Sequence, residues 1–366
     1  MIRLAVIGAG HLGKIHARQA AKIPGFKLVG VADPSQQAAE DIADELGAEA
    51  HSSHTTLLDR IDAAVIATPT STHCQVGLDL LSNGVHTLIE KPLAATTQQA
   101  RELVDCAEAE GRVLQVGHVE QFNPAVQAVR QYIKQPKFIQ ARRYSAYTFR
   151  STDIGVVMDV MIHDLDLILS WVGGTPQRLE GLGVSVMGHN EDVADVRIKF
   201  ADGCVAQLTA SRVSHVSVRE MQIWCPDAAV TIDFAAPSAS VVRPSDSLLD
   251  KLPDPTLMSA QEKRQSQDQL FNDYLNIEKI QPEPQNAIVE ELIDFREAIT
   301  TGRSPQVPGS AGLAVVACCE EILNSIADHA WDGRPDGRRG PFAAFQPDTI
   351  RPPHWHLGTD DKRRAG

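Results

Sequence analysis

The sequence predicts an α/β protein in which a doubly wound parallel sheet is followed by an α+β domain with a mostly antiparallel sheet. Short apolar runs alternate with helix-period segments over residues 1–117, and longer strand-like stretches follow one another over residues 177–233. Apolar strands joined by helical crossovers are typical of a parallel sheet covered on both faces, whereas consecutive strands favour antiparallel pairing. At 366 residues the chain has room for about two domains.

The first predicted domain, residues 1–120, alternates strands and helices. The expected strands are Arg3–Ile7, Lys27–Val31, Ala63–Ala67, His86–Ile89 and Arg112–Val116. The expected helices are Leu12–Lys22, Gln36–Leu46, Thr72–Leu81 and Thr97–Ala109. Because crossovers between parallel strands are right-handed, few topologies remain, and a doubly wound nucleotide-binding (Rossmann) fold leads them.

The second predicted domain, residues 121–330, opens with a helix, a strand and a helix, at Ala125–Ile133, Phe138–Tyr147 and Met158–Trp171. The strand-like stretches that follow are Arg178–Met187, Ala194–Phe200, Cys204–Ser214, Arg219–Trp224 and Ala229–Phe234. The turn residues Ala201, Asp202 and Gly203 predict a hairpin between two of these strands.

The remaining segments differ in composition. Residues 235–286 are rich in Pro, Ser, Asp and Gln, which predicts a partly ordered insertion. The apolar spacing of Ile288, Leu292, Phe295 and Ile299 indicates one helix, and a second is expected at Ala311–Ala327. Residues 331–366 are rich in Gly, Pro and Arg and are expected to form a flexible tail.

The net charge of −13 excludes the electrostatic footprint of a protein that binds nucleic acid or an anionic membrane, although a local basic pocket remains compatible with an anionic small substrate. None of the six cysteines lies in a CxxC pair, so we expect reduced thiols and no metal site. No apolar run approaches the ~18 residues of a membrane span, and no signal-peptide pattern is present. These features predict a cytoplasmic protein.

The segment GAGHLG, residues 8–13, follows the first strand and opens a helix. In this motif Gly8 allows a tight turn, Gly10 lets the backbone approach a pyrophosphate, and Gly13 permits close packing of helix on strand. The motif spans His11 and Leu12 as well, and we count all five residues as candidate cofactor contacts. The structural alternative is an ordinary glycine-rich turn.

Asp33 ends the second predicted strand, 20 residues after Gly13. A carboxylate at this position accepts hydrogen bonds from ribose hydroxyls and repels a 2′-phosphate, so NAD is expected rather than NADP. Pro34 and Ser35 follow it without an adjacent arginine. The alternative role for Asp33 is to cap the following helix.

The segment ATPTSTH, residues 67–73, follows the third strand, where ligands bind in such sheets. Thr68, Pro69, Thr70 and His73 are therefore candidate cofactor contacts. The alternative is an ordinary strand-to-helix turn with Thr72 as the N-cap.

The tripeptide Glu90-Lys91-Pro92 ends the fourth predicted strand. An ammonium group at this edge of the sheet would face the ligand crevice, where it could hydrogen-bond a substrate oxygen and pass protons. The alternative is a solvated lysine. We also expect a cis peptide bond before Pro92.

The segment MDVMIHDLDLIL, residues 158–169, places Asp159 and His163 four positions apart, on one face of a helix. A carboxylate beside an imidazole orients the ring and stabilises its protonated form, which suits a general base. Asp166 extends this stripe. The alternative is a set of surface ion pairs.

The order GxGxxG, then EKP, then DxxxH resembles the Gfo/Idh/MocA oxidoreductase family over nearly the whole chain. The resemblance implies a nicotinamide-dependent dehydrogenase of two domains, with Lys91 as the catalytic lysine and Asp159 and His163 as the DxxxH pair. Glu90 and Lys91 then also border the cofactor. Residues 117–126, GHVEQFNPAV, and residues 158–169 are most similar to the UDP-N-acetylglucosamine 3-dehydrogenase group of this family.

The reaction that this resemblance implies is NAD-dependent oxidation of a secondary hydroxyl of a sugar or sugar nucleotide. His163 would take the hydroxyl proton, Lys91 would hydrogen-bond the oxygen, and Asp159 would orient the imidazole. The 3-hydroxyl of UDP-N-acetylglucosamine is the specific expectation, with Arg142, Arg143 and Arg150 as candidate contacts for its diphosphate. The alternatives are an inositol or polyol dehydrogenase, a glycosidase that retains NAD, and a non-catalytic nucleotide-binding regulator.

The family commonly uses the open face of the second sheet between subunits, which implies a homodimer or homotetramer. Two departures from the family pattern are visible. Gly155 is followed by Val156 and Val157 where relatives often have further glycines, and Gln121 stands where many members have arginine.

Overall fold

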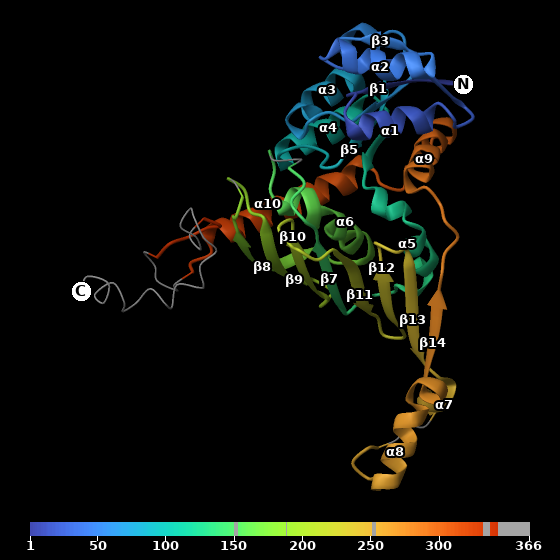
Figure 1. Ribbon diagram of the computed structural model, residues 1–366, viewed down its shortest axis with the longest axis vertical. Coiled ribbons are helices and arrows are strands. Elements are labelled where there is room, and N and C mark those ends of the chain that lie inside the picture. The colour runs from blue at the N-terminus through green and yellow to red at the C-terminus, as the bar shows by residue number, and fades with distance from the viewer. Residues whose placement is uncertain (150–152, 188, 251–253, 332–336, 343–366) are drawn as a thin grey trace, which may run out of the picture. The chain divides into compact units, whose positions relative to one another are not determined.

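The computed structural model describes residues 1–149, 153–187, 189–250, 254–331 and 337–342 (Figure 1). The chain forms two compact units. The first comprises Met1–Phe122, Asp153–Leu169 and Gln285–Asn324. The second comprises Asn123–Thr152, Ser170–Pro284 and Ser325–Gly366. The first unit thus contains two segments that come much later in the chain than its sheet.

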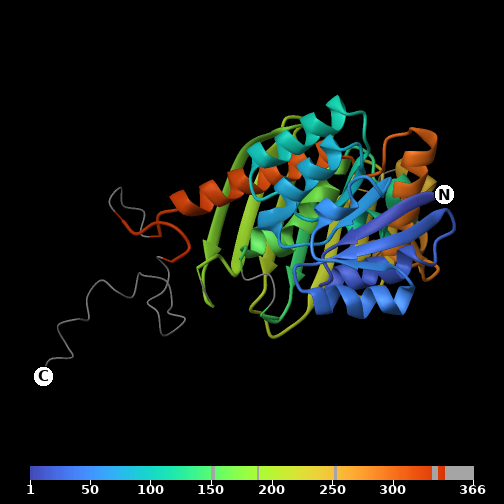
Figure 2. The same cartoon turned by 90° about the horizontal axis from the view of Figure 1, so that it is seen from above.

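The first unit is built on a six-stranded parallel sheet of order β3-β2-β1-β4-β5-β6, which confirms the doubly wound fold. Its strands are β1 (Ile2–Ile7), β2 (Phe26–Ala32), β3 (Glu49–His51), β4 (Ala63–Ile66), β5 (His86–Glu90) and β6 (Leu114–Gly117). Its first helices are α1 (His11–Ala20), α2 (Gln36–Leu46), α3 (Thr70–Ser82) and α4 (Thr97–Ala109), and the short 3-10 turns η1 (His54–Leu57) and η2 (Val119–Phe122) lie between elements. Figure 2 shows helices on both faces of these strands.

The strands β1, β4, β5 and β6 have almost entirely buried residues, as expected where helices cover both faces. The core between the sheet and α1 also includes α9 (Ala287–Thr301), whose Leu292 and Phe295 are fully buried against the side chains of β1 and β2. The apolar stripe of residues 288–299 is therefore explained by packing on this sheet.

Helix α10 (Gly309–Asp328) begins against side chains of β6 and of the segment after β5. Gly309 lies against Leu114, and Gly312 lies against Val116 and Leu93, so closely that a Cβ atom at either glycine would meet a side chain within 2.6 Å. By length and apolar composition α10 is the one described helix that could cross a membrane, and 39% of its most apolar window is buried within the protein.

The second unit is built on an eight-stranded sheet of order β14-β13-β12-β11-β7-β10-β9-β8. Its strands are β7 (Phe138–Tyr144), β8 (Pro176–Val184), β9 (Val193–Phe200), β10 (Val205–Ser211), β11 (Val218–Trp224), β12 (Ala229–Asp233), β13 (Ser238–Pro244) and β14 (Leu275–Ile280). All neighbouring pairs are antiparallel except β7 with β10. This confirms the mostly antiparallel second sheet and the hairpin between β9 and β10.

Residues 235–286, expected to be a partly ordered insertion, contribute two strands to this sheet. Between β13 and β14 the chain forms α7 (Asp246–Asp250), α8 (Ala260–Gln269) and the π-helical turn η5 (Leu270–Tyr274). The polar composition of residues 235–286 did not predict these strands, because β14 is an edge strand with no fully buried residue. The helix predicted at residues 125–133 is α5 (Pro124–Val129) with the short turn η3 (Arg130–Tyr132). The expected flexible tail lies mostly outside the described residues.

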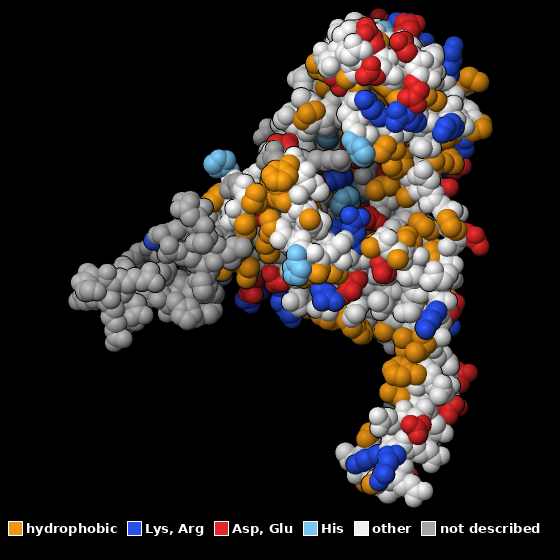
Figure 3. All heavy atoms as spheres, in the orientation of Figure 1, with side chains coloured by type: hydrophobic (Ala, Val, Ile, Leu, Met, Phe, Trp, Pro, Cys, Tyr) orange, Lys and Arg blue, Asp and Glu red, His pale blue; other side chains and the backbone are white. Residues whose placement is uncertain are grey.

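Figure 3 shows acidic and basic side chains interspersed over the visible face, with no continuous basic patch among the residues coloured there.

Candidate active site

The glycine loop joins β1 to α1 at the carboxyl edge of the parallel sheet. Gly8 has φ +101°, and a Cβ there would lie 2.4 Å from the carbonyl oxygen of Ala67. A Cβ on Gly13 would lie 1.8 Å from the carbonyl oxygen of Gly8. Gly10, the N-cap of α1, has open space where its Cβ would be and is exposed, as are His11 and Leu12. Two glycines thus let α1 approach the strands, and the third leaves room beside the start of the helix for a ligand.

Asp33 follows β2 and lies beside this loop. Its Oδ2 accepts a hydrogen bond from Ala9 N at 2.8 Å, and its Oδ1 accepts one from Ser35 N at 2.8 Å. Ser35, not Asp33, is the N-cap of α2. A carboxylate held next to a phosphate-binding loop is the arrangement expected for recognition of an unphosphorylated ribose.

The loop between β4 and α3 carries the next group of candidates. Helix α3 begins at Thr70 with Pro69 as its N-cap, so the alternative in which Thr72 is the cap is wrong. The imidazole of His73 is buried, with Nδ1 2.8 Å from Pro92 O and Nε2 2.9 Å from Thr68 O. This ring therefore links the loop after β4 to the loop after β5, and its contact with a cofactor remains a prediction.

Lys91 lies at the end of β5, and its peptide bond to Pro92 is cis, as expected. Its Nζ donates to Asp159 Oδ1 at 2.9 Å and to Asp159 O at 2.7 Å. The side chains of Lys91 and Asp159 remain 14% and 24% exposed. The structure thus brings two of the predicted catalytic residues together across 68 positions, and pairs the carboxylate with the lysine.

Asp159 lies on a π-helical turn, η4 (Val157–Met161), which precedes α6 (Ile162–Trp171). The sequence predicted one α-helix over residues 158–171. Wide turns of this kind recur at functional sites because they re-aim side chains. His163, on the first turn of α6, is half-buried in the same unit. The role of Asp159 in orienting His163 remains a prediction.

A buried histidine–carboxylate contact behind Lys91 was not predicted from the sequence. His16 Nε2 lies 2.6 Å from Glu90 Oε1, and Glu90 Oε2 accepts a hydrogen bond from Lys91 N at 3.2 Å. Burial raises the pKa of Glu90, but the hydrogen bond and charge of His16, with the charge of Lys91, outweigh it and lower the pKa overall. Glu90 is therefore a buried acceptor behind the lysine, and its contact with a cofactor remains a prediction.

His16 was detectable in principle. It comes three residues after Gly13, on the buried face of α1 that the glycine brings against the sheet. A polar residue on such a face needs a partner.

Gln121, which stands where many family members have arginine, makes hydrogen bonds in the structure. Gln121 is buried in η2, and its Nε2 donates to Asp166 Oδ2 at 2.8 Å, while its backbone oxygen accepts from Gln306 Nε2. An amide therefore holds Asp166 here without adding a charge. At the other departure, Val156 and Val157 are fully buried.

The candidate diphosphate contacts lie in the second unit. Arg142 is paired with Glu220, and its Nε lies 2.8 Å from Glu220 Oε1. Arg143 is buried, with its guanidinium 5.0 Å from the ring centre of Phe234. Arg150 lies outside the described residues.

Comparison with known proteins identifies the family of the chain. Residues 2–118 match the model of the oxidoreductase family with an NAD-binding Rossmann fold, and residues 97–231 match the GFO/IDH/MocA C-terminal domain. The chain is 33% identical over 326 residues to UDP-N-acetylglucosamine 3-dehydrogenase of Acidithiobacillus ferrooxidans, covering 89% of this chain and 97% of that one. It is 31% identical over 232 residues to scyllo-inositol 2-dehydrogenase (NAD(+)) of Bacillus subtilis, covering 58% and 68%.

Solved structures give the same result. A structure of the Acidithiobacillus ferrooxidans enzyme matches with a TM-score of 0.78 and 32% identity, over 89% of this chain and 97% of that one. Levoglucosan dehydrogenase in complex with NADH matches with a TM-score of 0.76 over 89% and 97%, and at 18% identity it shows likeness of fold alone. With the glycine loop, the lysine at the end of β5 and these matches, the chain belongs to the Gfo/Idh/MocA family of NAD-binding oxidoreductases.

Proposed function

We propose that this protein is an NAD-dependent dehydrogenase that oxidises the 3-hydroxyl of a UDP-linked N-acetylhexosamine, with UDP-N-acetylglucosamine as the first candidate. The observation that carries the dehydrogenase chemistry is the Lys91–Asp159 pair at the sheet edge that also carries the glycine loop. The choice of substrate rests on the Acidithiobacillus ferrooxidans relative, which matches over 97% of its length.

The residues of the first unit fit an NAD molecule. The open space at Gly10 and the uncapped start of α1 suit a pyrophosphate, because helix N-termini attract anions. The Asp33 carboxylate suits the ribose hydroxyls, and the loop of Thr68, Pro69 and Thr70 follows the neighbouring strand at the same sheet edge. When bound, NAD supplies the nicotinamide ring that accepts the hydride.

The chain itself handles the proton and the developing charge. The ammonium of Lys91 hydrogen-bonds the reacting oxygen and stabilises negative charge on it, while Asp159 holds the ammonium in place. His163 accepts the hydroxyl proton as general base. The balance is one secondary alcohol and NAD⁺ converted to one ketone, NADH and one proton.

The test is to incubate the enzyme with NAD and UDP-N-acetylglucosamine in the presence of a ketone trap. The trap matters because alcohol oxidation by NAD is unfavourable near neutral pH. We expect NADH absorbance to appear and mass spectrometry to show the trap adduct of a sugar nucleotide that has lost two hydrogen atoms. Lys91→Ala serves as the inactive control. Turnover of free inositol or a free hexose, with neither binding nor turnover of UDP-sugars, would replace this proposal by a polyol dehydrogenase.

We further propose that the protein is a homodimer or homotetramer formed through the open face of the second sheet. One row of directly opposed residues across this face is apolar: Val205, Phe138, Trp224, Ala229, Val242 and Ile277. Trp224 is 37% exposed and stacks on Phe138 with ring centres 5.0 Å apart, and Ile277 is 43% exposed. An apolar row on a sheet face favours burial against another surface.

Light scattering on wild type and Trp224→Glu tests this assembly. We expect the wild type to be oligomeric and the variant to dissociate, whereas a monomeric wild type would refute it.

We also propose a cytoplasmic location, which the proposed reaction and the thiols support. All six cysteines are free, which suits a reducing compartment. Fractionation of cells that express the protein tests this location.

A further inference from the structure

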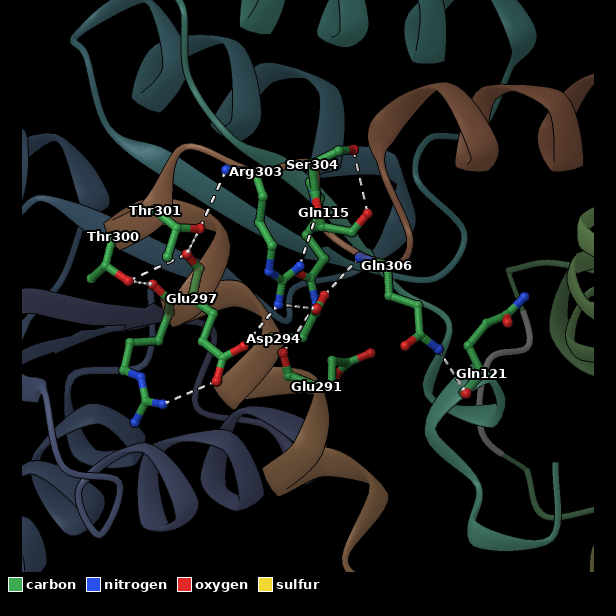
Figure 4. A network of polar contacts seen from close by, with 12 residues as sticks. Gln115, Gln121, Glu291, Asp294, Glu297, Thr300, Thr301, Arg303, Ser304 and Gln306 are labelled. Atoms are coloured by element: carbon green, nitrogen blue, oxygen red, sulfur yellow. Dashed lines mark hydrogen bonds and ion pairs between the residues drawn. The ribbon is translucent and has the colours of Figure 1, made fainter. Parts of the chain in front are cut away.

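Glu291, on α9, is a buried carboxyl group that the proposed chemistry does not use. Its side chain has no exposed surface, and neither carboxyl oxygen has a hydrogen-bond partner among the described residues. In Figure 4 it lies beside Asp294 and Gln115, and no dashed line reaches its carboxyl group. Gln115 Nε2 instead donates to the backbone oxygen of Glu291 at 3.0 Å. A buried polar group of this kind requires an explanation.

The carboxyl group of Glu291 lies next to the His16–Glu90 pair. One side-chain N or O atom from each of these three residues lies within 4.8 Å of the other two. One bridging water or a small rotation of the Glu291 side chain closes such a span. Because Glu90 also accepts the backbone N–H of Lys91, a short path leads from Glu291 to the proposed catalytic lysine.

Glu90 has little freedom to move away from this path. A Cβ on Gly117, the β6 residue opposite Glu90, would lie 2.9 Å from Glu90 Oε2. The carboxylate is therefore enclosed by the backbone of β6 on one side and by His16 on another.

The neighbouring charges make an ionised Glu291 unfavourable. Asp294 is satisfied by Arg303 and by Gln306 N, and Glu90 is satisfied by His16. An additional buried carboxylate without a partner would carry the full desolvation penalty and would repel these acids. The proton therefore stays on Glu291, which makes the group a hydrogen-bond donor.

The direction of the pKa shift of Glu291 agrees with a neutral carboxyl group. Burial raises the pKa of Glu291 well above its ordinary value, and the charges of Glu90, Asp294 and Asp166 raise it further. His118 is also buried near this cluster, and burial lowers its pKa, so it adds no compensating positive charge. The ammonium of Lys91 already faces the carboxylate of Asp159, and the His16 ring faces that of Glu90.

We propose that Glu291 is a positioning residue whose neutral carboxyl donates to the His16–Glu90 pair and thereby holds the backbone of Lys91 in its working position. This inference rests on the proposed role of Lys91. It assigns Glu291 no contact with substrate or cofactor.

A metal ion bound by His16, Glu90 and Glu291 is the competing explanation. The 2.6 Å between His16 Nε2 and Glu90 Oε1 is a hydrogen-bond distance. Two ligands on one tetrahedral zinc ion would be roughly 3.3 Å apart, given bonds of about 2.0–2.1 Å. The geometry therefore favours the proton over a metal, and elemental analysis of purified protein should find no stoichiometric metal. Stoichiometric metal that is lost in Glu291→Gln would overturn the proposal.

Kinetics of two variants test the positioning role. Glu291→Gln keeps a neutral donor and should retain kcat within about twofold, whereas Glu291→Leu removes the donor and should lower kcat by about tenfold or more, because a displaced catalytic group loses rate steeply. KM and NADH affinity should stay within about twofold in both. Glu290→Gln, the same change one residue earlier on α9, is the matched control and should behave as wild type. Equal loss of activity in the Gln and Leu variants, or full activity in the Leu variant, would overturn the proposal.

Backbone hydrogen exchange gives a readout that does not depend on turnover. The Lys91 N–H is held by Glu90, so its exchange should accelerate in Glu291→Leu and stay at the wild-type rate in Glu291→Gln. Unchanged exchange in the Leu variant would refute the path through Glu90. If instead Lys91→Ala proved fully active while exchange changed as expected, the proposed function would fail and the link from Glu291 to Lys91 would stand.

The pH dependence of stability tests the protonation state. Folding raises the pKa of Glu291 above its ordinary value of 4.5. Above pH 4.5 the unfolded chain therefore releases a proton that the folded protein keeps. Rising pH then favours unfolding until it reaches the pKa of the folded state. Glu291→Gln has no such titration. The melting temperature of Glu291→Gln minus that of the wild type should therefore increase as pH rises from 4.5. Parallel curves of melting temperature against pH would refute a neutral Glu291.

Discussion

The glycine loop offers a pair of substitutions that separate packing from cofactor binding. Alanine at position 13 would place Cβ 1.8 Å from Gly8 O and 2.8 Å from Gly8 C, both backbone atoms that no rotamer change can move. Relief to an ordinary contact of about 3.4 Å requires α1 to shift by about 1.6 Å from β1, which overpacks the neighbouring core. We expect Gly13→Ala to lower the free energy of unfolding by about 2–3 kcal/mol.

Alanine at position 10 is the matched control. Its Cβ would meet nothing within 4 Å, and φ −72° with ψ −166° is accessible to alanine. Stability should therefore change by less than about 1 kcal/mol, the scale of an N-cap substitution. The added methyl group would still stand where the pyrophosphate is expected, so we predict that Gly10→Ala weakens NADH binding at least about tenfold, or about 1.4 kcal/mol.

The assay combines urea unfolding followed by tryptophan fluorescence with titration of NADH fluorescence. The expected pattern is an unstable Gly13→Ala protein and a stable Gly10→Ala protein that binds NADH poorly. Wild-type stability in Gly13→Ala would refute the packing argument, and wild-type NADH affinity in Gly10→Ala would refute the assignment of the phosphate site.

Three further results are expected. Asp33→Ser should relax the preference for NAD over NADP, measured as the ratio of kcat/KM for the two cofactors; a wild type that uses NADP tenfold better would contradict this role. Lys91→Ala and His163→Ala should each lower turnover by roughly 10²-fold with little change in NADH affinity, and near-normal turnover of the histidine variant would leave the lysine as the main catalytic group. Arg212→Ala should destabilise the second unit by about 3–5 kcal/mol in thermal unfolding, because it leaves Asp192, which is fully buried and 2.7 Å from Arg212 Nε, without its cation. Unchanged stability would show that the backbone donors of Val186 and Met187 to Asp192 Oδ2 suffice without the cation.

Local sequence patterns determined the elements of the first unit. Apolar runs and helix-period segments predicted β1, β2, β4, β5 and β6 and the helices between them, because strands covered on both faces must be apolar throughout. The glycine spacing and the EKP tripeptide marked the sheet edge that holds the candidate site, since turns that approach a ligand place strict demands on side-chain size. These features depend on residues close in sequence.

The tertiary structure alone decided which polar groups meet. Nothing in the spacing of Lys91 and Asp159 showed that they would pair, and nothing connected Glu291 with Glu90. Contacts between distant segments depend on how helices pack on the sheet. The residue type of a carboxyl group does not show whether it is buried or exposed. The strands β13 and β14 were also missed, because half-exposed strands near an edge are specified by pairing with their neighbours rather than by apolar periodicity.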